Sequence, residues 1–262
     1  MKAKILVDGG APKVPAKELE RVIAEAGFGI GDDGADFGVV VGGDGRFSYY
    51  GRTEDIPLLF VGVRSGGATG SRALLAQTTY GELPGSLERI RKGDYRVDEH
   101  RRLGVEKNGR KLGEVFTDVY LQRGSEGDCI RYRVRVKGEG VSLDESAIGD
   151  GVVVSTSAGS TGYYSYPDRI KGDWMDPAGF ARIARDRVGI CHVNPTYTER
   201  AGDLRHPLRY TVPWSSRVEL SLYRKARARL YGTTADTAGV EVGIEDEVAV
   251  VPGLKTTRLI SF

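Results

Sequence analysis

Cysteine, histidine and long apolar runs are scarce in this chain of 262 residues. Its two cysteines, Cys129 and Cys191, lie far apart and outside any C-x-x-C pair, which excludes a disulfide framework and a thiolate zinc site. We therefore expect both thiols to be reduced and buried. The three histidines, His100, His192 and His206, lack the i, i+4 spacing that places two imidazoles on one helix face. Any metal is expected to arrive with a bound ligand.

No run of about 18 apolar residues occurs, and the apolar stretch Ile5 to Val7 is too short for a signal peptide. The sequence therefore predicts a cytoplasmic protein without a membrane span. Charge is nearly balanced, with 38 Lys and Arg against 36 Asp and Glu, so no strong attraction to nucleic acid is expected. We interpret the basic stripes at Arg131 to Lys137 and Lys225 to Arg229 as solvated strand faces rather than nucleic-acid sites.

The hydrophobic rhythm of the chain changes near residue 97. Before that point, short apolar runs alternate with helix-like segments, as in parallel strands joined by crossover helices. After it, apolar and polar residues alternate, most clearly over Ile130 to Lys137, as in strands with one wet face. The length allows two domains. We expect an α/β domain with a Rossmann-like parallel sheet over 1–96 and a mainly β domain over 97–262, whose last residues pack back on the first.

The same patterns predict individual elements. In the first part, strands are expected at 5–7, 39–41 and 58–63, and helices at 17–26 and 71–77. In the second part, a helix is expected from Pro177, because proline is tolerated at the first helical position. Strands are expected there at 113–122, 130–137, 151–154, 217–223, 227–231 and 248–251.

A glycine-rich segment, Gly42-Gly43-Asp44-Gly45, follows the apolar run Val39 to Val41. Because glycine has no Cβ, the backbone there can turn sharply and bring N–H groups within reach of phosphate oxygens. Asp44 is then left facing the ligand, where a carboxylate can hold Mg²⁺ or take a proton from a hydroxyl. The same four residues are also typical of a tight turn without a ligand.

A second segment of glycines and hydroxyls, Ser155 to Tyr163, also follows a valine run and suits a loop close to a nucleoside. Tyr163 and Tyr164 can offer a stacking face to a base. A Ser- and Thr-rich helix cap is the alternative. Asp118 lies in a strand pattern, where its carboxylate needs a partner such as a ribose diol or an Arg, although an exposed strand face explains it equally well. The alternative for Asp150 is a hairpin turn residue. Together the two glycine-rich segments suggest a nucleotide kinase.

In this order, these stretches resemble the NAD kinase family over most of the chain, as a divergent member of archaeal type. The G-G-D-G aspartate of the family corresponds to Asp44, and its G-[IV]-N-x-G element to Gly62 to Gly66. Its N-[ED] pair corresponds to Thr117-Asp118. The strongest match is D-G-x-x-x-S-T-x-x-G-S-T-A-Y, which corresponds to the stretch from Asp150 to Tyr163.

The resemblance implies an NAD kinase-like fold and transfer of a phosphate from ATP or polyphosphate to the adenosine 2′-hydroxyl of NAD, with Mg²⁺ or another divalent cation. Asp44 is implied as the catalytic residue. No metal ligand is assigned directly, since Mg²⁺ is carried by the nucleotide, with Asp44 as a candidate contact. The implied partners are NAD, ATP and further copies of the chain in a homodimer or homotetramer, without nucleic acid or membrane. Phosphate or ATP binding is implied for Gly42, Gly43, Gly45 and Arg46, and NAD binding for Arg64, Thr117, Asp118, Asp150, Ser157, Ala158, Thr161, Gly162 and Tyr163.

The chain departs from the family pattern at several positions. Arg46 stands where threonine is common, and Arg64 and Thr117 replace two asparagines. The D-G-Q element has no good copy, since the comparable position reads Tyr231-Gly232. Two alternatives therefore stay open: a kinase acting on another hydroxyl acceptor, such as a sugar, inositol or nucleoside, and a sensor that binds NAD or NADP without turnover.

Overall fold

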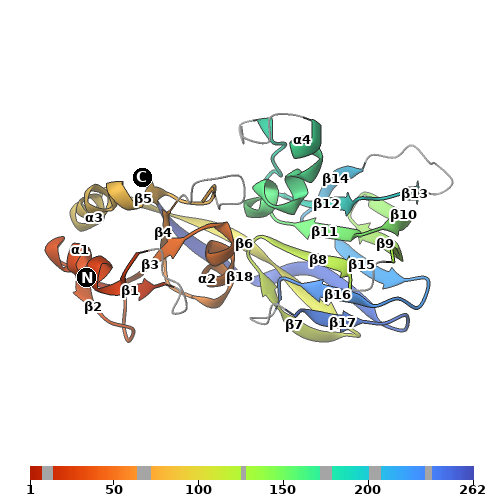
Figure 1. Cartoon of the computed structure of the whole chain (residues 1–262), viewed down its shortest axis with the longest axis horizontal. Coiled ribbons are helices and arrows are strands. Elements are labelled where there is room, and N and C mark those ends of the chain that lie inside the picture. The colour runs from red at the N-terminus through yellow and green to blue at the C-terminus, as the bar shows by residue number, and fades with distance from the viewer. Residues whose placement is uncertain (8–13, 64–71, 125–127, 172–178, 201–207, 234–237) are drawn as a thin grey trace. The chain divides into compact units, whose positions relative to one another are not determined.

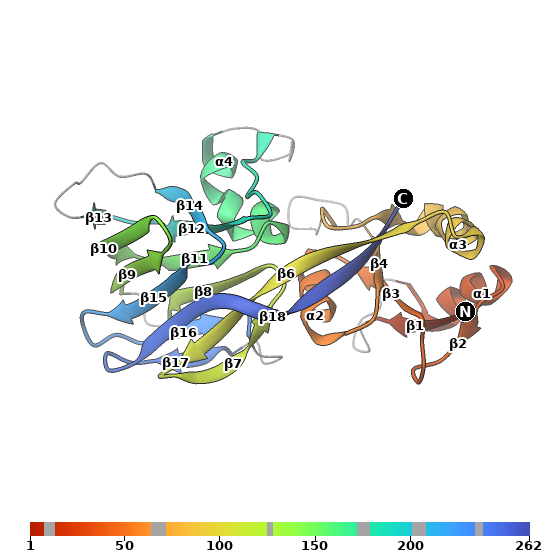
Figure 2. The ribbon, with the colours of Figure 1, turned by 180° about the vertical axis from the view of Figure 1, so that it is seen from behind.

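A computed structural model describes residues 1–7, 14–63, 72–124, 128–171, 179–200, 208–233 and 238–262. The chain divides into two compact units, one formed by Met1–His100 with Thr256–Phe262 and the other by Arg101–Lys255. Two long strands, β6 (Arg96–Lys107) and β18 (Glu247–Ser261), contribute residues to both units (Figures 1 and 2). The domain boundary at residue 96 stays a prediction.

The first unit is built on a parallel sheet in which β1 pairs with β2 and β3, and β4 pairs with β3, β5 and the end of β18. Every residue of β3 and β4 is buried, as expected for parallel strands whose two faces are both covered. The apolar faces of α1 and α3 pack into one core with the sheet. The elements are β1 (Lys2–Leu6), α1 (Ala16–Glu25), β2 (Gly29–Ile30), β3 (Phe37–Gly42), α2 (Asp44–Thr53), β4 (Leu58–Gly62), β5 (Thr78–Thr79), η1 (Tyr80–Glu82) and α3 (Leu83–Lys92).

The helix predicted at 17–26 and the three strands predicted before residue 64 are confirmed within a few residues. The helix predicted at 71–77 is wrong, since its described residues 72–77 form turns and no helix. The side chain of Gln77 explains this, because its Oε1 accepts the Phe60 N–H at 2.9 Å and its Nε2 donates to the Leu75 carbonyl at 2.8 Å. The polar groups of this segment therefore bind strand β4 and each other instead of forming a helical ladder.

The second unit contains two antiparallel sheets. One has the order β13-β10-β9-β15-β18, with β6 and β7 joined to it, and the other has the order β14-β12-β11-β8-β16-β17. The buried residues of both sheets form one apolar core. The elements not yet given are β7 (Arg110–Val115), β8 (Asp118–Arg123), β9 (Ile130–Gly138), β10 (Val141–Gly149), β11 (Gly151–Ser155), η2 (Ala158–Thr161), η3 (Tyr163–Ser165), α4 (Tyr166–Lys171), β12 (Arg187–Val193), β13 (Tyr197–Arg200), β14 (Arg209–Pro213), β15 (Arg217–Leu222), β16 (Ala228–Tyr231) and β17 (Val240–Val242).

Two of the predicted elements in this unit need correction. The strand predicted at 113–122 is interrupted, because β7 ends at Val115 and β8 begins at Asp118 with a bend at residues 116–117 between them. Pro177, where a helix was expected to begin, lies outside the described residues, and residues 180–186 are not helical. The helix of this region is α4, which lies earlier in the chain.

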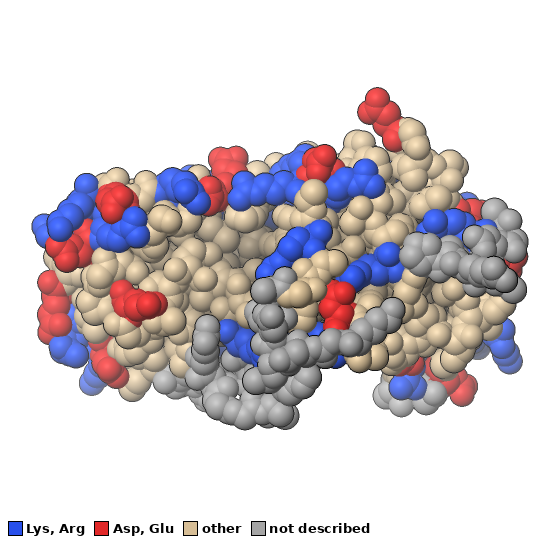
Figure 3. Space-filling view, turned by 90° about the horizontal axis from the view of Figure 1, so that it is seen from above, with Lys and Arg blue, Asp and Glu red and all other residues tan. Residues whose placement is uncertain are grey.

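The basic stripe on β9 is matched by carboxylates on neighbouring strands. Arg133 forms a two-pronged ion pair with Asp144, and Arg135 lies 3.5 Å from Glu219 and 3.3 Å from Glu247. Figure 3 likewise shows basic and acidic side chains interspersed over the face in view. These ion pairs support the interpretation of the stripe as a solvated strand face.

The two cysteines differ in exposure. Cys191 is fully buried in β12, and burial raises its pKa to about 12. Cys129 is exposed, so the expectation that both thiols are buried is wrong for this residue. It lies just before β9, where the alternating pattern has not yet begun. Among the helices that the structure describes, none combines the length and apolar character needed to cross a bilayer.

Candidate functional site

The first glycine-rich segment joins a buried strand to a helix. β3 ends at Gly42, Gly43 is extended with φ −119° and ψ −178°, and α2 begins at Asp44. The Gly43 carbonyl accepts the N–H groups of Arg46 at 2.9 Å and Phe47 at 3.1 Å, which close the first helical turn. A helix amino terminus carries unpaired N–H groups and a positive partial charge, and both favour an anion such as phosphate.

Asp44 is held in place by the chain that follows β4. Its Oδ1 accepts the backbone N–H of Leu75 at 2.9 Å. Beneath it, Phe47 is fully buried and stacks on Phe60 of β4 with ring centroids 4.6 Å apart. The first turn of α2 is therefore anchored to the sheet, and the half-buried carboxylate lies at its amino end.

The glycines of this segment differ in the space around them. A Cβ on Gly42 would lie 3.1 Å from Cβ of Arg46, so the close approach of the Arg46 stem depends on glycine there. A Cβ on Gly45 would meet nothing within 4 Å, and Gly45 is exposed. The interpretation as a tight turn is thus replaced by a strand-to-helix junction with open space at Gly45.

The second glycine-rich segment is tied by side chains to the bend before β8. The Thr156 hydroxyl donates to the Phe116 carbonyl at 2.7 Å, and the Thr156 N–H donates to the Thr117 carbonyl at 2.8 Å. The Ser155 hydroxyl lies 3.3 Å from the same Thr117 carbonyl. A Cβ on Gly159 would lie 2.4 Å from that carbonyl oxygen. The second segment and the bend before β8 therefore approach too closely for any residue other than glycine at position 159.

The hydroxyls of the second segment divide into two groups. Those of Ser155, Thr156 and Ser160 bind the protein itself, since Ser160 donates to the Ser157 carbonyl at 2.6 Å and accepts the Ile183 N–H at 3.0 Å. Within the described part of the chain, no hydrogen bond involves the hydroxyls of Ser157 and Thr161. Both can therefore bond to a ligand, with Ser157 half-buried and Thr161 7% exposed. Ser157, which precedes η2, makes no side-chain capping bond, whereas the Thr156 hydroxyl accepts the Gly159 N–H at 3.4 Å.

Asp118 lies directly beside this segment. β8 and β11 pair so that Asp118 is opposite Ser155, and a Cβ on Gly162 would lie 2.9 Å from Oδ2 of Asp118. Burial raises the pKa of the half-buried Asp118 carboxyl to about 7, against a hydrogen bond from Thr117 that lowers it. A carboxyl group that titrates near neutral pH is characteristic of functional sites.

Three tyrosines line the same end of β8. Tyr120 stacks on Tyr231 of β16 with ring centroids 5.2 Å apart, and it meets Tyr163 edge to face at 5.0 Å. Tyr163 is 50% exposed, so its ring can accept a stacked base. Tyr164 is buried in a small cluster with Val153 and cannot do so, which corrects the expectation for that residue.

The sequence interpretation missed Tyr120 and Tyr231 as members of this site. Tyr120 lies two residues after Asp118 in β8, and this spacing places both side chains on the same face of the strand. The spacing could therefore have indicated that Tyr120 belongs to the site. Tyr231 lies opposite Tyr120 only because β16 pairs with β8, and no sequence pattern shows that register.

The structure separates one predicted residue from this cluster. Asp150 precedes β11, whose other end carries Ser155. Its Oδ1 lies 2.8 Å from Nε of Arg123, and its Oδ2 accepts the Asn194 amide at 2.9 Å. Arg64 and His206 lie outside the described residues, and Asp44 with its neighbours belongs to the other compact unit.

A magnesium ion carried by a nucleotide is compatible with the groups present. The described residues contain no group of three or more His, Cys, Asp or Glu side chains that could hold a metal by themselves. Mg²⁺ in phosphoryl-transfer sites is commonly held by one or two carboxylates together with substrate phosphates. Asp44, at a helix amino terminus, can supply one such carboxylate.

The chain is similar to curated NAD kinases, although no protein-family model matches it. An NAD kinase of Citrifermentans bemidjiense is 35% identical over 136 residues, which cover 49% of this chain and 44% of that protein. An NAD kinase of Methanopyrus kandleri is 27% identical over 168 residues, which cover 61% of this chain and 53% of that protein. The chain thus spans about half the length of the curated relatives it matches.

Solved structures extend the similarity to the whole fold. The crystal structure of an NAD kinase from Archaeoglobus fulgidus in complex with ATP matches with a TM-score of 0.68 at 17% identity, covering 100% of this chain and 93% of that one. Yeast NADH kinase complexed with NADH matches with a TM-score of 0.73 at 14% identity, covering 100% and 83%. The predicted fold, an α/β unit with a parallel sheet and a mainly β unit, is confirmed. These similarities confirm the resemblance to the NAD kinase family that the two glycine-rich segments carry.

Proposed function

We propose that this protein is a kinase that transfers the terminal phosphate of ATP to the 2′-hydroxyl of the adenosine ribose of NAD, making NADP. The observation that carries the proposal is the cluster on the second segment. There, a half-buried carboxyl group, two available hydroxyls and an exposed tyrosine ring lie together at the end of β11. This combination suits a ribose, which offers hydroxyls, joined to a base, which offers a flat face.

The proposal assigns the dinucleotide to the second segment. Asp118 accepts a hydrogen bond from a ribose hydroxyl or a base edge, and the hydroxyls of Ser157 and Thr161 bind further polar atoms. Thr117, Ala158 and Gly162 contribute backbone and close surface beside them, while the Tyr163 ring stacks on a base. Asp150, at the other end of β11, is assigned to a more distant part of the dinucleotide, and Arg64 keeps the contact that the family resemblance implies for it.

The proposal assigns the phosphates to the first segment. N–H groups at the start of α2, with Gly42, Gly43 and Gly45 beside them, bind phosphate oxygens, and Arg46 adds a positive charge. Asp44 positions the attacking hydroxyl and takes its proton as the bond to phosphorus forms. When bound with the nucleotide, Mg²⁺ neutralises charge on the phosphates.

Two relatives with solved structures support the substrate classes, since one NAD kinase was crystallised with ATP and the yeast NADH kinase with NADH. Polyphosphate is the alternative donor. A homodimer or homotetramer is the proposed assembly, which light scattering of the purified protein tests directly.

The experiment that tests the proposal offers the purified protein a panel of acceptors and donors with Mg²⁺. NAD, NADH, a hexose, inositol and adenosine are each incubated with ATP or polyphosphate, and products are identified by mass spectrometry. A phosphorylated dinucleotide supports the proposal. A phosphorylated sugar, inositol or nucleoside with no dinucleotide product would favour the kinase of another acceptor. Tight NAD binding in calorimetry without any product would favour the sensor.

A further inference from the structure

The part of the second segment that carries the available Thr161 hydroxyl and the exposed Tyr163 ring has little structure of its own. It consists of two short 3₁₀ turns, η2 and η3, that meet at Gly162. Few backbone hydrogen bonds hold it, among them Gly162 N–H to the Gly159 carbonyl at 2.9 Å and Ser165 N–H to the Gly162 carbonyl at 3.1 Å. Because 3₁₀ turns of this length are weak, groups outside them must fix their position.

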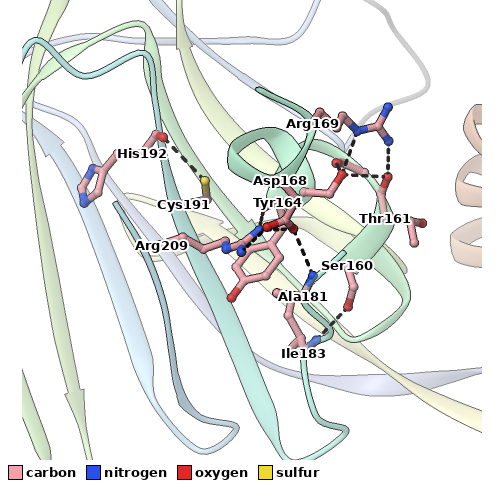
Figure 4. A network of polar contacts seen from close by, with 12 residues as sticks. Ser160, Thr161, Tyr164, Asp168, Arg169, Ala181, Ile183, Cys191, His192 and Arg209 are labelled. Atoms are coloured by element: carbon pink, nitrogen blue, oxygen red, sulfur yellow. Dashed lines mark hydrogen bonds and ion pairs between the residues drawn. The ribbon is translucent and has the colours of Figure 1, made fainter. Parts of the chain in front are cut away.

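Arg169 supplies such a group (Figure 4). Its Nη2 donates to the Thr161 carbonyl at 2.6 Å, and its Nε donates to the Ser165 hydroxyl at 2.8 Å. The Ser165 hydroxyl in turn donates to the Gly162 carbonyl at 2.7 Å. One planar, rigid guanidinium thus bonds to both ends of the stretch that holds Gly162 and Tyr163.

The helix α4, which carries Arg169, is itself bonded to a strand of the sheet. The neighbouring Asp168 in α4 forms a two-pronged ion pair with Arg209 of β14, at 2.6 and 2.7 Å. Oδ2 of Asp168 also accepts the Ala181 N–H at 3.0 Å, and Arg209 donates to the Tyr164 carbonyl at 3.1 Å. Charge-assisted hydrogen bonds of Asp168 thus tie α4 to the sheet strand β14, and those of Arg169, the next residue of α4, tie α4 to the segment (Figure 4).

We infer that Arg169 is a positioning residue for the dinucleotide: it holds the Thr161 hydroxyl and the Tyr163 ring in the arrangement that binds the acceptor. This inference rests on the proposed function for the identity of the ligand. Phe180 lies under the guanidinium, 5.1 Å from it, and keeps the planar group from rotating away. Lysine can reproduce the charge of Arg169 but not its two directed bonds.

The test compares Arg169→Met with Arg169→Lys and with a matched surface variant, Arg21→Met, which removes an exposed i, i+4 ion pair with Glu25 in α1. We expect Arg169→Met to raise KM for NAD by about tenfold or more, because small displacements of binding groups have large effects. KM for ATP and kcat should change less than about threefold. Arg169→Lys should recover part of the loss, guanidinium chloride at low millimolar concentration should improve NAD binding to Arg169→Met, and Arg21→Met should match the wild type.

A second readout needs no substrate. Amide hydrogen exchange in peptides spanning 158–165 should speed up in Arg169→Met relative to Arg21→Met, while exchange in β11 stays unchanged. Unchanged exchange at 158–165 would overturn the inference, as would an unchanged KM for NAD in an active enzyme. If the wild type neither binds nor phosphorylates NAD, the proposed function is wrong, and the exchange measurement still decides whether Arg169 positions the segment.

Discussion

The two glycine-rich segments of this chain are built by different means. The first, at Gly42–Gly45, owes its geometry to backbone, because a buried strand runs directly into a helix whose first turn contains the exposed Gly45. The second, at Ser155–Tyr163, owes its geometry to side chains, because the hydroxyls of Ser155 and Thr156 bond to the bend before β8 and that of Ser160 bonds to Ser157 and Ile183. The first segment therefore has open space at Gly45, whereas the second is crowded around Gly159 and Gly162.

The largest effect is expected from Asp44, the one carboxylate of the first segment. Asp44→Asn keeps an oxygen that can accept the Leu75 N–H, so the fold should be retained. Because the amide cannot take a proton, NADP formation should fall by roughly 10²-fold or more, while NAD still binds. Steady-state rates and calorimetry measure the two quantities. Asp94→Asn, in an exposed ion pair of the same unit, is the control and should keep the wild-type rate. Equal turnover in Asp44→Asn would remove that residue from the mechanism.

Because Gly159 is crowded and Gly45 is not, an added methyl group should destabilise the protein much more at position 159 than at position 45. In Gly159→Ala, Cβ would lie 2.2 Å from the Ser155 hydroxyl oxygen, so the free energy of unfolding should fall by about 2 to 3 kcal/mol. In Gly45→Ala, no atom lies within 4 Å of the new Cβ, so the change should stay below about 1 kcal/mol. Urea unfolding measures both. Equal destabilisation of the two variants would contradict the comparison.

A smaller effect is expected from pH, through Asp118 of the second segment. Its pKa of about 7 in the folded chain means that the carboxyl is increasingly ionised between pH 6 and 8, and only the ionised form has both oxygens free to accept hydrogen bonds. KM for NAD should therefore fall several-fold over this range in the wild type. Asp118→Asn should show a flatter profile and a higher KM at pH 8. A wild-type profile as flat as that of Asp118→Asn would argue against a contact between this carboxyl and the dinucleotide.

The same group links stability to pH. The folded-state pKa of about 7 lies above the usual 3.8, so the folded chain holds a proton that the unfolded chain has released between these values. The associated stabilisation is present at low pH and is lost as pH rises through about 7. The difference in Tm between Asp118→Asn and the wild type should therefore shift in favour of the variant from pH 5 to pH 8. A pH-independent difference would contradict the assigned shift.

The smallest effect is expected in the reactivity of the two thiols. The reactivity of Cys191 reports on the packing of β12 against β11, the strand that leads into the second segment. Cys191 pairs with Val153 of β11, and burial raises its pKa to about 12, so it should resist a disulfide reagent at pH 8. Cys129 is exposed and should react first. Titration of the folded protein should therefore show one reactive thiol, and Gly159→Ala should expose the second more often. Two equally fast thiols in the wild type would contradict the packing described for β12.

Much of the fold was predictable because it depends on burial patterns. β3 and β4 are covered on both faces, so their sequences are continuous apolar runs. β9 is covered on one face, so apolar and polar residues alternate along it. The long strand β18 was predicted only in part, because Pro252 and Gly253 interrupt its pattern, although strand pairing carries it through to Ser261. The helix α3 was not predicted. A helix was expected at 71–77 instead, where Gln77 binds β4 and the Leu75 N–H binds Asp44.

The candidate site was predictable as a set of segments but not as a set of contacts. The motifs indicated Ser157 and Thr161 along with their neighbours, yet only the fold shows that Ser155, Thr156 and Ser160 are engaged with the protein. For Ser155 and Thr156 this division depends on the pairing of β11 with β8, which brings the Phe116 and Thr117 carbonyls beside them. The role of Arg169 likewise depends on the direction in which α4 leaves the segment.

The proposed reaction is phosphorylation of NAD at the adenosine 2′-hydroxyl. The most direct measurement is the phosphorus NMR spectrum of the dinucleotide product formed by the wild-type protein from NAD, ATP and Mg²⁺. The account predicts one new phosphomonoester signal, coupled to the 2′ proton of the adenosine ribose. A dinucleotide that stays unmodified, or a phosphate on any other hydroxyl, would contradict it.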